Sequence, residues 1–164
     1  GTIGLEILED LPNLDAAIIP IGGGGMISGI GTALEAAGRP ARLIGVEAAA
    51  APAAYRSIRD GVCCSSLNPE PSIADGLLSG VHEMTFSIFR HLLENVVLVS
   101  EPELKEAVVH FQRQEQLMIE PSAAIGLAGL LHHIDTLVGK KVVLILTSRN
   151  IDAGLYNRIV QEAE

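Results

Sequence analysis

Four consecutive glycines, Gly22, Gly23, Gly24 and Gly25, stand between a short β-branched run and a helix-like apolar pattern. Glycine lacks a Cβ atom, so a ligand can approach its backbone closely. A glycine turn that opens into a helix also leaves backbone N–H groups unpaired at the positive end of the helix dipole. The glycines therefore predict a phosphate-binding site made of backbone alone, with a tight turn that binds nothing as the alternative.

Polar residues also close two other apolar runs. Glu47 ends the run at 41–47, and the sequence Thr-Ser-Arg-Asn at 147–150 closes the run that starts at 141. In parallel α/β sheets, ligands bind at the carboxyl ends of the strands. We therefore expect the glycines, Glu47 and residues 147–150 to lie along one edge of a sheet.

The elements that must position these residues are expected from hydrophobic periodicity. Strands are expected at 15–21, 41–47, 96–99 and 141–147, and helices at 1–10, 26–37, 51–59, 83–94, 101–118 and 123–131 and from 152 onward. Ser100 and Glu103 have the spacing of a helix capping box. This alternation predicts one α/β domain over residues 1–164, with three layers and a mostly parallel sheet of about four strands covered by helices on both faces.

Composition narrows the class of partner. The chain has 164 residues, is 48% hydrophobic and carries a formal net charge of −9, which argues against nucleic acid or an anionic membrane as a partner. No apolar run reaches the roughly 18 residues of a membrane span. The cysteines are the adjacent pair Cys63 and Cys64, which we expect to be reduced thiols in a cytoplasmic protein.

The five histidines and Ser28 carry no catalytic pattern. No carboxylate or cysteine stands at ligand spacing from His82, His91, His110, His132 or His133. Ser28 follows the glycines but lacks the G-x-S-x-G pattern of a nucleophile elbow. We expect these residues to have structural roles.

Six segments occur in an order that is typical of one enzyme family. They are Gly1-Thr2 with Glu6-Ile7, residues 20–26 with Gly29, Ile44-Gly45-Val46-Glu47, Ile73-Ala74-Asp75-Gly76, Ile119-Glu120-Pro121-Ser122, and residues 146–152. Together they resemble the carboxyl-terminal half of a pyridoxal-phosphate enzyme of the serine/threonine dehydratase type, in the tryptophan-synthase-β fold group, such as threonine ammonia-lyase or serine racemase. The resemblance implies an incomplete large cofactor domain of the fold type II pyridoxal-phosphate enzymes.

The resemblance also implies a role for each matching residue. The glycines, with the amide of Met26, would hold the cofactor phosphate, and Thr147 would face the pyridine nitrogen. Glu120 would lie near the ring, and Asp75-Gly76 would border the substrate. A hydroxyl partner leaves the ring nitrogen unprotonated, which suits β-elimination from a hydroxy amino acid to a 2-oxo acid and ammonia. In some relatives a divalent cation sits on the residue matching Glu47 with a second carboxylate six residues on, where this chain has Ala53.

Two departures from the family pattern stand out. Arg149 occupies a position where the family usually has glycine, and the amino-terminal half that carries the Schiff-base lysine has no counterpart here. Lys105, Lys140 and Lys141 are the only lysines, and solvated positions are expected for all three. We therefore predict no catalytic residue in this chain alone. We expect it to act on a small amino acid only when an amino-terminal half or another chain completes it, and to form a homo-oligomer.

Two other functions remain open. A nicotinamide-dinucleotide binder would use the glycines for the pyrophosphate and Glu47 for the ribose, although the third glycine of G-x-G-x-x-G is out of place. A non-catalytic binding or assembly module would keep the fold without the chemistry.

Overall fold

The computed structural model describes residues 1–39 and 41–162. Its four-stranded sheet comprises β1 (Ala16–Pro20), β2 (Arg42–Ala48), β3 (Leu93–Val99) and β4 (Val142–Leu144), in the spatial order β3-β2-β1-β4. Every described strand pair is parallel. The predicted α/β class with a parallel sheet is confirmed.

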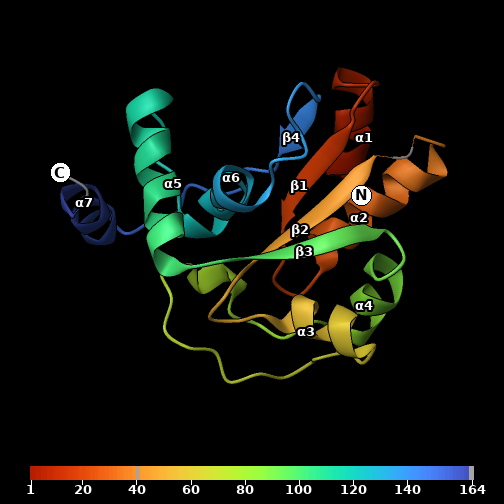
Figure 1. Ribbon diagram of the computed structural model, residues 1–164, viewed down its shortest axis with the longest axis horizontal. Helices are drawn as coiled ribbons and strands as arrows, with labels where there is room; N and C mark the ends of the chain where they lie inside the picture. The colour runs from red at the N-terminus through yellow and green to blue at the C-terminus, as the bar shows by residue number, and fades with distance from the viewer. Residues whose placement is uncertain (40, 163–164) are drawn as a thin grey trace.

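Helices cover both faces of this sheet. They are α1 (Thr2–Asp10), α2 (Gly25–Ala36), α3 (Ala53–Asp60), the short 3-10 helix η1 (Asp75–Leu77), α4 (Glu83–Phe89), α5 (Glu101–Gln114), α6 (Pro121–His133) and α7 (Ala153–Gln161). Figure 1 shows α5, α6 and α7 gathered on one side and α1, α2 and α4 on the other.

Two aliphatic clusters form the core, one on each face. Ile18 packs in the cluster that α5 and α6 cover, whereas its neighbour Ile19 packs in the cluster of α1, α2 and α4. Side chains alternate between the faces of a strand, so a central strand covered on both sides must be apolar throughout. All of β1 is buried accordingly.

The strand register brings the expected site residues to one edge. Ile18 of β1 pairs with Ile44 of β2 and with Leu144 of β4. Because the strands are parallel, the glycines after β1, Glu47 near the end of β2 and Thr147 after β4 all belong to the carboxyl edge of the sheet.

Several element boundaries differ from the sequence prediction, among them the end of the helix expected at 101–118, which lies at Gln114. The helix expected at 83–94 ends at Phe89, and β3 begins at Leu93 instead of Val96. The apolar residues at 92–93 suit a helix or a strand equally, and pairing of Leu93 with Leu43 of β2 decides for the strand. β4 is also shorter than the run at 141–147, because its pairing with β1 ends at Leu144, opposite Ile18.

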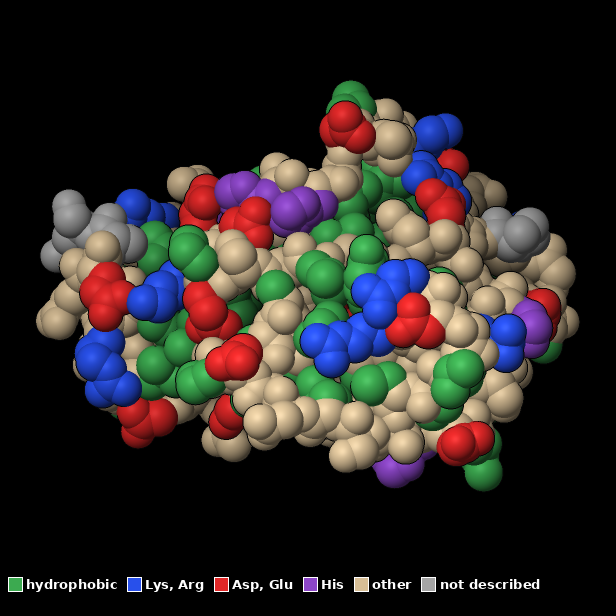
Figure 2. Space-filling view, turned by 60° about the horizontal axis from the view of Figure 1, so that its bottom comes forward, with side chains coloured by type: hydrophobic (Ala, Val, Ile, Leu, Met, Phe, Trp, Pro, Cys, Tyr) green, Lys and Arg blue, Asp and Glu red, His purple; other side chains and the backbone are tan. Residues whose placement is uncertain are grey.

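The described surface carries charges of both signs. Figure 2 shows one face, on which acidic, basic and hydrophobic side chains are interspersed. None of the described helices combines the length and the apolar character that crossing a membrane requires.

Candidate functional site

The glycine bend connects the end of β1 to the start of α2. The N–H of Ile21 donates to the carbonyl of Val46 at 2.9 Å, which is the last hydrogen bond before the bend. Gly24 then takes a left-handed conformation with φ of 86° and serves as the N-cap of α2. Only glycine adopts such a conformation readily, so the bend depends on this residue type.

The surroundings of the bend explain why small residues occur here. A Cβ atom on Gly24 would lie 2.7 Å from Cε1 of Phe89 and 2.8 Å from Oγ1 of Thr85, which is too close for either. A Cβ on Gly25 would meet nothing within 4 Å. The bend is thus packed against α4 at Gly24 and open at Gly25, which is exposed.

The amides of the bend are available to a ligand. In the described part of the chain, the N–H groups of residues 22–26 donate to no acceptor, and the helix ladder begins with Ser28 donating to the carbonyl of Gly24 at 3.1 Å. The dipole of α2 adds partial positive charge at this end. Successive free N–H groups at a helix N-terminus fit the phosphate of pyridoxal phosphate.

A second part of the edge is built around the start of α6. Glu120 is the N-cap of this helix, and its Oε2 accepts a hydrogen bond from Oγ of Ser148 at 2.7 Å. Oγ of Ser122, in the first turn of α6, accepts from the N–H of Gly76 at 3.1 Å. These bonds tie η1, α6 and the segment after β4 into one cluster. It contains two of the predicted ring and substrate residues, Glu120 and Gly76.

Thr147 and Arg149 follow β4 at the same edge. Thr147 is exposed and lies three residues beyond Leu144, whose partner Ile18 precedes the glycine bend on the neighbouring strand. Arg149 is also exposed, and its Nε donates to the carbonyl of Met118 at 3.3 Å. The large side chain that departs from the family pattern is therefore directed onto the segment before Glu120.

Glu47 is almost completely buried, with 1% of its surface exposed. Its Oε1 accepts from the N–H of Ala54 at 2.7 Å and its Oε2 from the N–H of Tyr55 at 2.8 Å. Burial raises the pKa of this carboxyl to about 7, against the opposing effect of the backbone amides. Glu47 thus lies against the first turn of α3 and accepts two of the N–H groups left unpaired there.

This position does not suit a metal ligand. Both carboxylate oxygens of Glu47 are engaged, and the second ligand position is Ala53, the first residue of α3. Among the described residues, no group of three or more His, Cys, Asp or Glu side chains could hold a metal ion. Glu47 and Ala53 therefore do not fit the divalent cation that the resemblance implied.

The three lysines lie away from the glycine bend. Nζ of Lys105 pairs with Oε2 of Glu162 at 2.6 Å, between α5 and α7. Lys140 and Lys141 precede β4, at the amino edge of the sheet, where the N–H of Lys141 donates to Oδ2 of Asp15 at 2.8 Å. The carboxyl edge, where the cofactor residues are predicted, is opposite.

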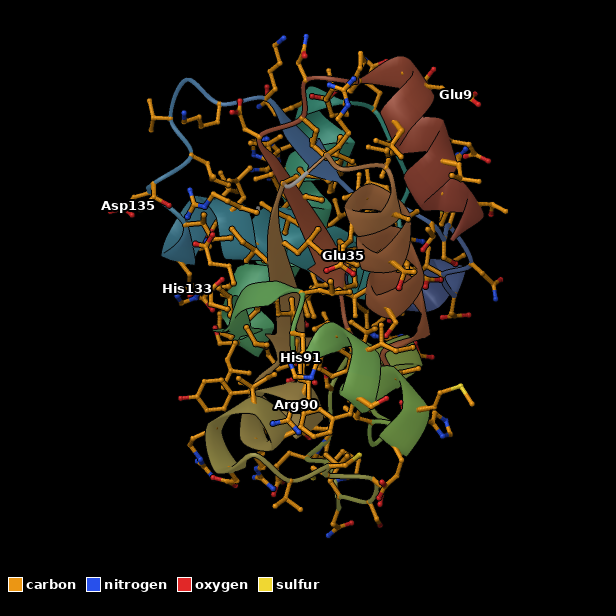
Figure 3. The ribbon with its side chains drawn as sticks, turned by 90° about the vertical axis from the view of Figure 1, so that its right-hand side faces the viewer. Glu9, Glu35, Arg90, His91, His133 and Asp135 are labelled. Carbon is orange, nitrogen blue, oxygen red and sulfur yellow. The ribbon has the colours of Figure 1, made fainter. Side chains whose placement is uncertain are left out.

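Sequence reasoning missed several contacts between distant segments. The rings of His132 and His133 pair with Glu106 and Glu103 at 3.1 and 2.9 Å, joining α6 to α5; Figure 3 labels His133 at the end of α6. His82 lies beside Gly23 of the bend. Periodicity gives no signal for either contact, because the partners are far apart in the sequence. The expected structural role of Ser28 agrees with its burial and its bond to the carbonyl of Thr85 at 3.0 Å.

The sequence matches one family model and is similar to several enzymes of known function. A family model described as pyridoxal-phosphate dependent enzyme matches residues 1–148. L-threonine ammonia-lyase of Geobacter sulfurreducens is 40% identical over 164 residues, an alignment that covers 98% of this chain and 40% of that protein. Serine racemase of Rattus norvegicus is 35% identical, over 93% of this chain and 46% of that protein.

Solved structures agree with the sequence relatives. The processed form of threonine deaminase isoform 2 from Solanum lycopersicum superimposes with a TM-score of 0.89 at 28% identity, covering 99% of this chain and 45% of that one. The chain therefore has the fold of fold type II pyridoxal-phosphate enzymes and spans less than half the length of these three relatives.

Proposed function

We propose that this chain, which belongs to the family of pyridoxal-phosphate-dependent enzymes, forms the cofactor-binding part of an ammonia-lyase for a hydroxy amino acid such as threonine or serine. The proposal rests chiefly on the glycine bend, whose free amides lie at the carboxyl edge of the sheet. Two relatives are named L-threonine ammonia-lyase, and the substrate proposed for this chain is inferred from these names.

The glycine bend and the cluster at α6 would contact different parts of the cofactor. The amides of residues 22–26 would bind its phosphate, and the hydroxyl of Thr147 would contact its pyridine nitrogen. Gly76 and Glu120 would border the ring and the substrate, held in place by Ser122 and Ser148. When bound, pyridoxal phosphate supplies an electron sink that permits loss of a group from the β-carbon of an amino acid.

The lysine that binds the cofactor covalently would come from outside this chain. Lys105 is paired with Glu162, and Lys140 and Lys141 lie at the opposite edge of the sheet. A Schiff-base lysine must also reach the cofactor, and the pairing of Lys105 and the place of Lys140 and Lys141 at the opposite edge of the sheet keep all three away from the glycine bend. We therefore propose that an amino-terminal half or a second chain completes the active site, and that this chain alone does not catalyse.

The dinucleotide alternative fits less well. A ribose-binding carboxylate must face the ligand, whereas both oxygens of Glu47 accept hydrogen bonds from the amides of α3.

The two thiols, Cys63 and Cys64, are free, as a reducing cytoplasm would keep them, and we propose that location for the protein.

Reconstitution tests the proposed function. The chain is mixed with the amino-terminal half of a threonine ammonia-lyase, pyridoxal phosphate and threonine, and ammonia release is measured. Reduction with borohydride followed by peptide mapping should then locate the cofactor on a lysine of the added half. Label on Lys105, Lys140 or Lys141 would contradict the proposed division of roles. No ammonia and no label, with intact folding, would favour a non-catalytic module.

A further inference from the structure

The segment between η1 and α4 borders the glycine bend from the side. Oγ of Ser79 lies 3.6 Å from the position that a Cβ on Gly22 would take. The His82 ring lies 3.2 Å through Cδ2, and 3.7 Å through Nε2, from the corresponding position on Gly23. Two polar side chains thus stand next to two of the four glycines.

Hydrogen bonds fix the backbone of His82 relative to the bend. Its N–H donates to the carbonyl of Gly23 at 3.4 Å. Oγ1 of Thr85 donates to the same carbonyl at 2.6 Å and to the carbonyl of His82 at 2.9 Å. These bonds hold the first turn of α4 against the bend. They also fix the position of the His82 Cα atom, from which the imidazole extends beside Gly23.

The two side chains are free to take a ligand. His82 and Ser79 are exposed, and in the described part of the chain neither side chain makes a hydrogen bond. His82 is the N-cap of α4, but its ring makes no capping bond. By contrast, His132 and His133 are both paired with glutamates.

His82 places a basic side chain beside the bend, which otherwise offers a ligand only backbone amides and neutral side chains. The side chains nearest to the Cβ positions of glycines 22–25 are Leu77, Ser79, His82, Thr85 and Phe89, and of these His82 alone is basic. An imidazole carries at least one N–H donor in either protonation state, and a serine hydroxyl can also donate. Hydrogen bonds to an ionised group are shorter and stronger than those between neutral groups.

We propose that His82, together with Ser79, is a side-chain ligand of the phosphate group that the glycine bend binds. The inference rests on the proposed function, because it takes the bend to be the phosphate site. This chain then holds the phosphate with an imidazole and a hydroxyl in addition to backbone amides.

Calorimetric titration of the chain with pyridoxal phosphate, inorganic phosphate and pyridoxal tests this assignment without requiring catalysis. His82→Ala should weaken binding of both phosphate-bearing ligands about five- to tenfold, and Ser79→Ala about two- to threefold. Binding of pyridoxal, which has no phosphate, should be unchanged in both variants. His82→Gln retains a donor and should recover part of the affinity.

His91→Ala is the matched control. His91 is also exposed and lies just past α4, where it lines a different hollow with Glu35 of α2; Figure 3 labels both residues. This variant should bind all three ligands as the wild type does, and circular dichroism should show every variant folded.

The outcomes separate this inference from the proposed function. Equal phosphate affinity in the wild type and His82→Ala would overturn the role of His82 and leave the bend as the phosphate site. If the wild type binds pyridoxal phosphate no better than pyridoxal and does not bind phosphate, the proposed function of the bend fails and the inference fails with it.

Discussion

At the scale of single residues, one backbone angle and two neighbouring side chains explain why position 24 is a glycine. Its φ of 86° is strained for any side chain, and a Cβ would press on Phe89 and Thr85. Gly24→Ala should therefore lower the free energy of unfolding by about 1–3 kcal/mol and disturb the bend. Urea unfolding followed by circular dichroism measures the change.

Gly25 provides the control for this substitution. It stands in the first turn of α2 and a Cβ there would meet nothing within 4 Å. Gly25→Ala should change the stability by less than about 1 kcal/mol, in the stabilising direction, because alanine is the better helix former. Equal losses in both variants would mean that the left-handed conformation of Gly24 does not matter.

Glu47 should give the protein a characteristic dependence of stability on pH. Its pKa is raised from 4.5 to about 7 in the folded chain, so between these values the folded state retains a proton that the unfolded state has lost. The free energy of unfolding should then fall as pH rises through this range, by at most about 1.4 kcal/mol per pH unit from this group.

Glu47→Gln, which cannot ionise, isolates that effect. Urea unfolding of both proteins at about pH 5 and about pH 8 should show the wild type losing stability relative to the variant as pH rises. The variant also alters the bonds to Ala54 and Tyr55, which shifts its stability at both pH values alike. Parallel pH profiles would show that Glu47 titrates at an ordinary value.

Individual residues were predictable where their own type carried the signal. Four glycines between a strand and a helix mark a bend whatever the fold, and the structure contains it with free amides. The position of His82 beside Gly23 could not be predicted, because it depends on how α4 packs on the bend. The cofactor roles of Gly76, Glu120 and Thr147 stay predictions.

At the scale of elements, Glu103 links the cap of α5 to α6, in addition to the apolar packing between the two helices. Its Oε2 accepts from the N–H and the Oγ of Ser100, both at 2.7 Å, which confirms the capping box expected from their spacing. Its Oε1 pairs with His133 at 2.9 Å. Glu103→Ala should cost about 1–2 kcal/mol of stability in thermal unfolding, since it removes a cap and an interhelical pair.

Glu106 tests whether the cap or the contact between glutamate and histidine matters more. It pairs with His132 at 3.1 Å, but its side chain is 62% exposed and caps nothing in the described part of the chain. Glu106→Ala should cost no more than about 0.5 kcal/mol, as is usual for exposed pairs. A loss as large as that of Glu103→Ala would assign the stabilisation to the histidine pairs.

Element types were easier to predict than element ends. The periodicity of apolar residues separates strands from helices, and every expected strand and helix is present. The ends of α4 and β4 depend on which strand lies alongside, which no local pattern reveals. The short η1, which places Gly76 against Ser122, was not predicted because three residues are too few for a periodicity.

At the scale of the whole molecule, β4 forms one edge of the described sheet and pairs with β1 only. Two large hydrophobic side chains flank this edge, Val138 at 89% and Leu146 at 39% exposure. Open strand edges beside apolar residues invite pairing with another chain. We propose that this edge is covered in the completed enzyme, and we expect the chain alone to self-associate.

Sedimentation velocity over a range of concentrations measures that association. Val138→Asp should weaken it at least about tenfold, because a buried unpaired charge is costly. Val62→Asp is the control, since Val62 is also exposed, at 70%, but follows α3 at a distance from β4 in the sequence and the sheet. A wild-type chain that stays monomeric at high concentration would contradict the expectation.

Hydrogen exchange of the free amides at residues 22–26 should also show whether an anion occupies the bend. Main-chain protons without an acceptor exchange rapidly with deuterated solvent, whereas those of the neighbouring buried strand β1 are protected. A few residues of fast exchange should therefore interrupt a slow region in a mass-spectrometric map. An anion bound at the bend would slow this exchange, so occupancy of the site could be followed without turnover and without a chromophore.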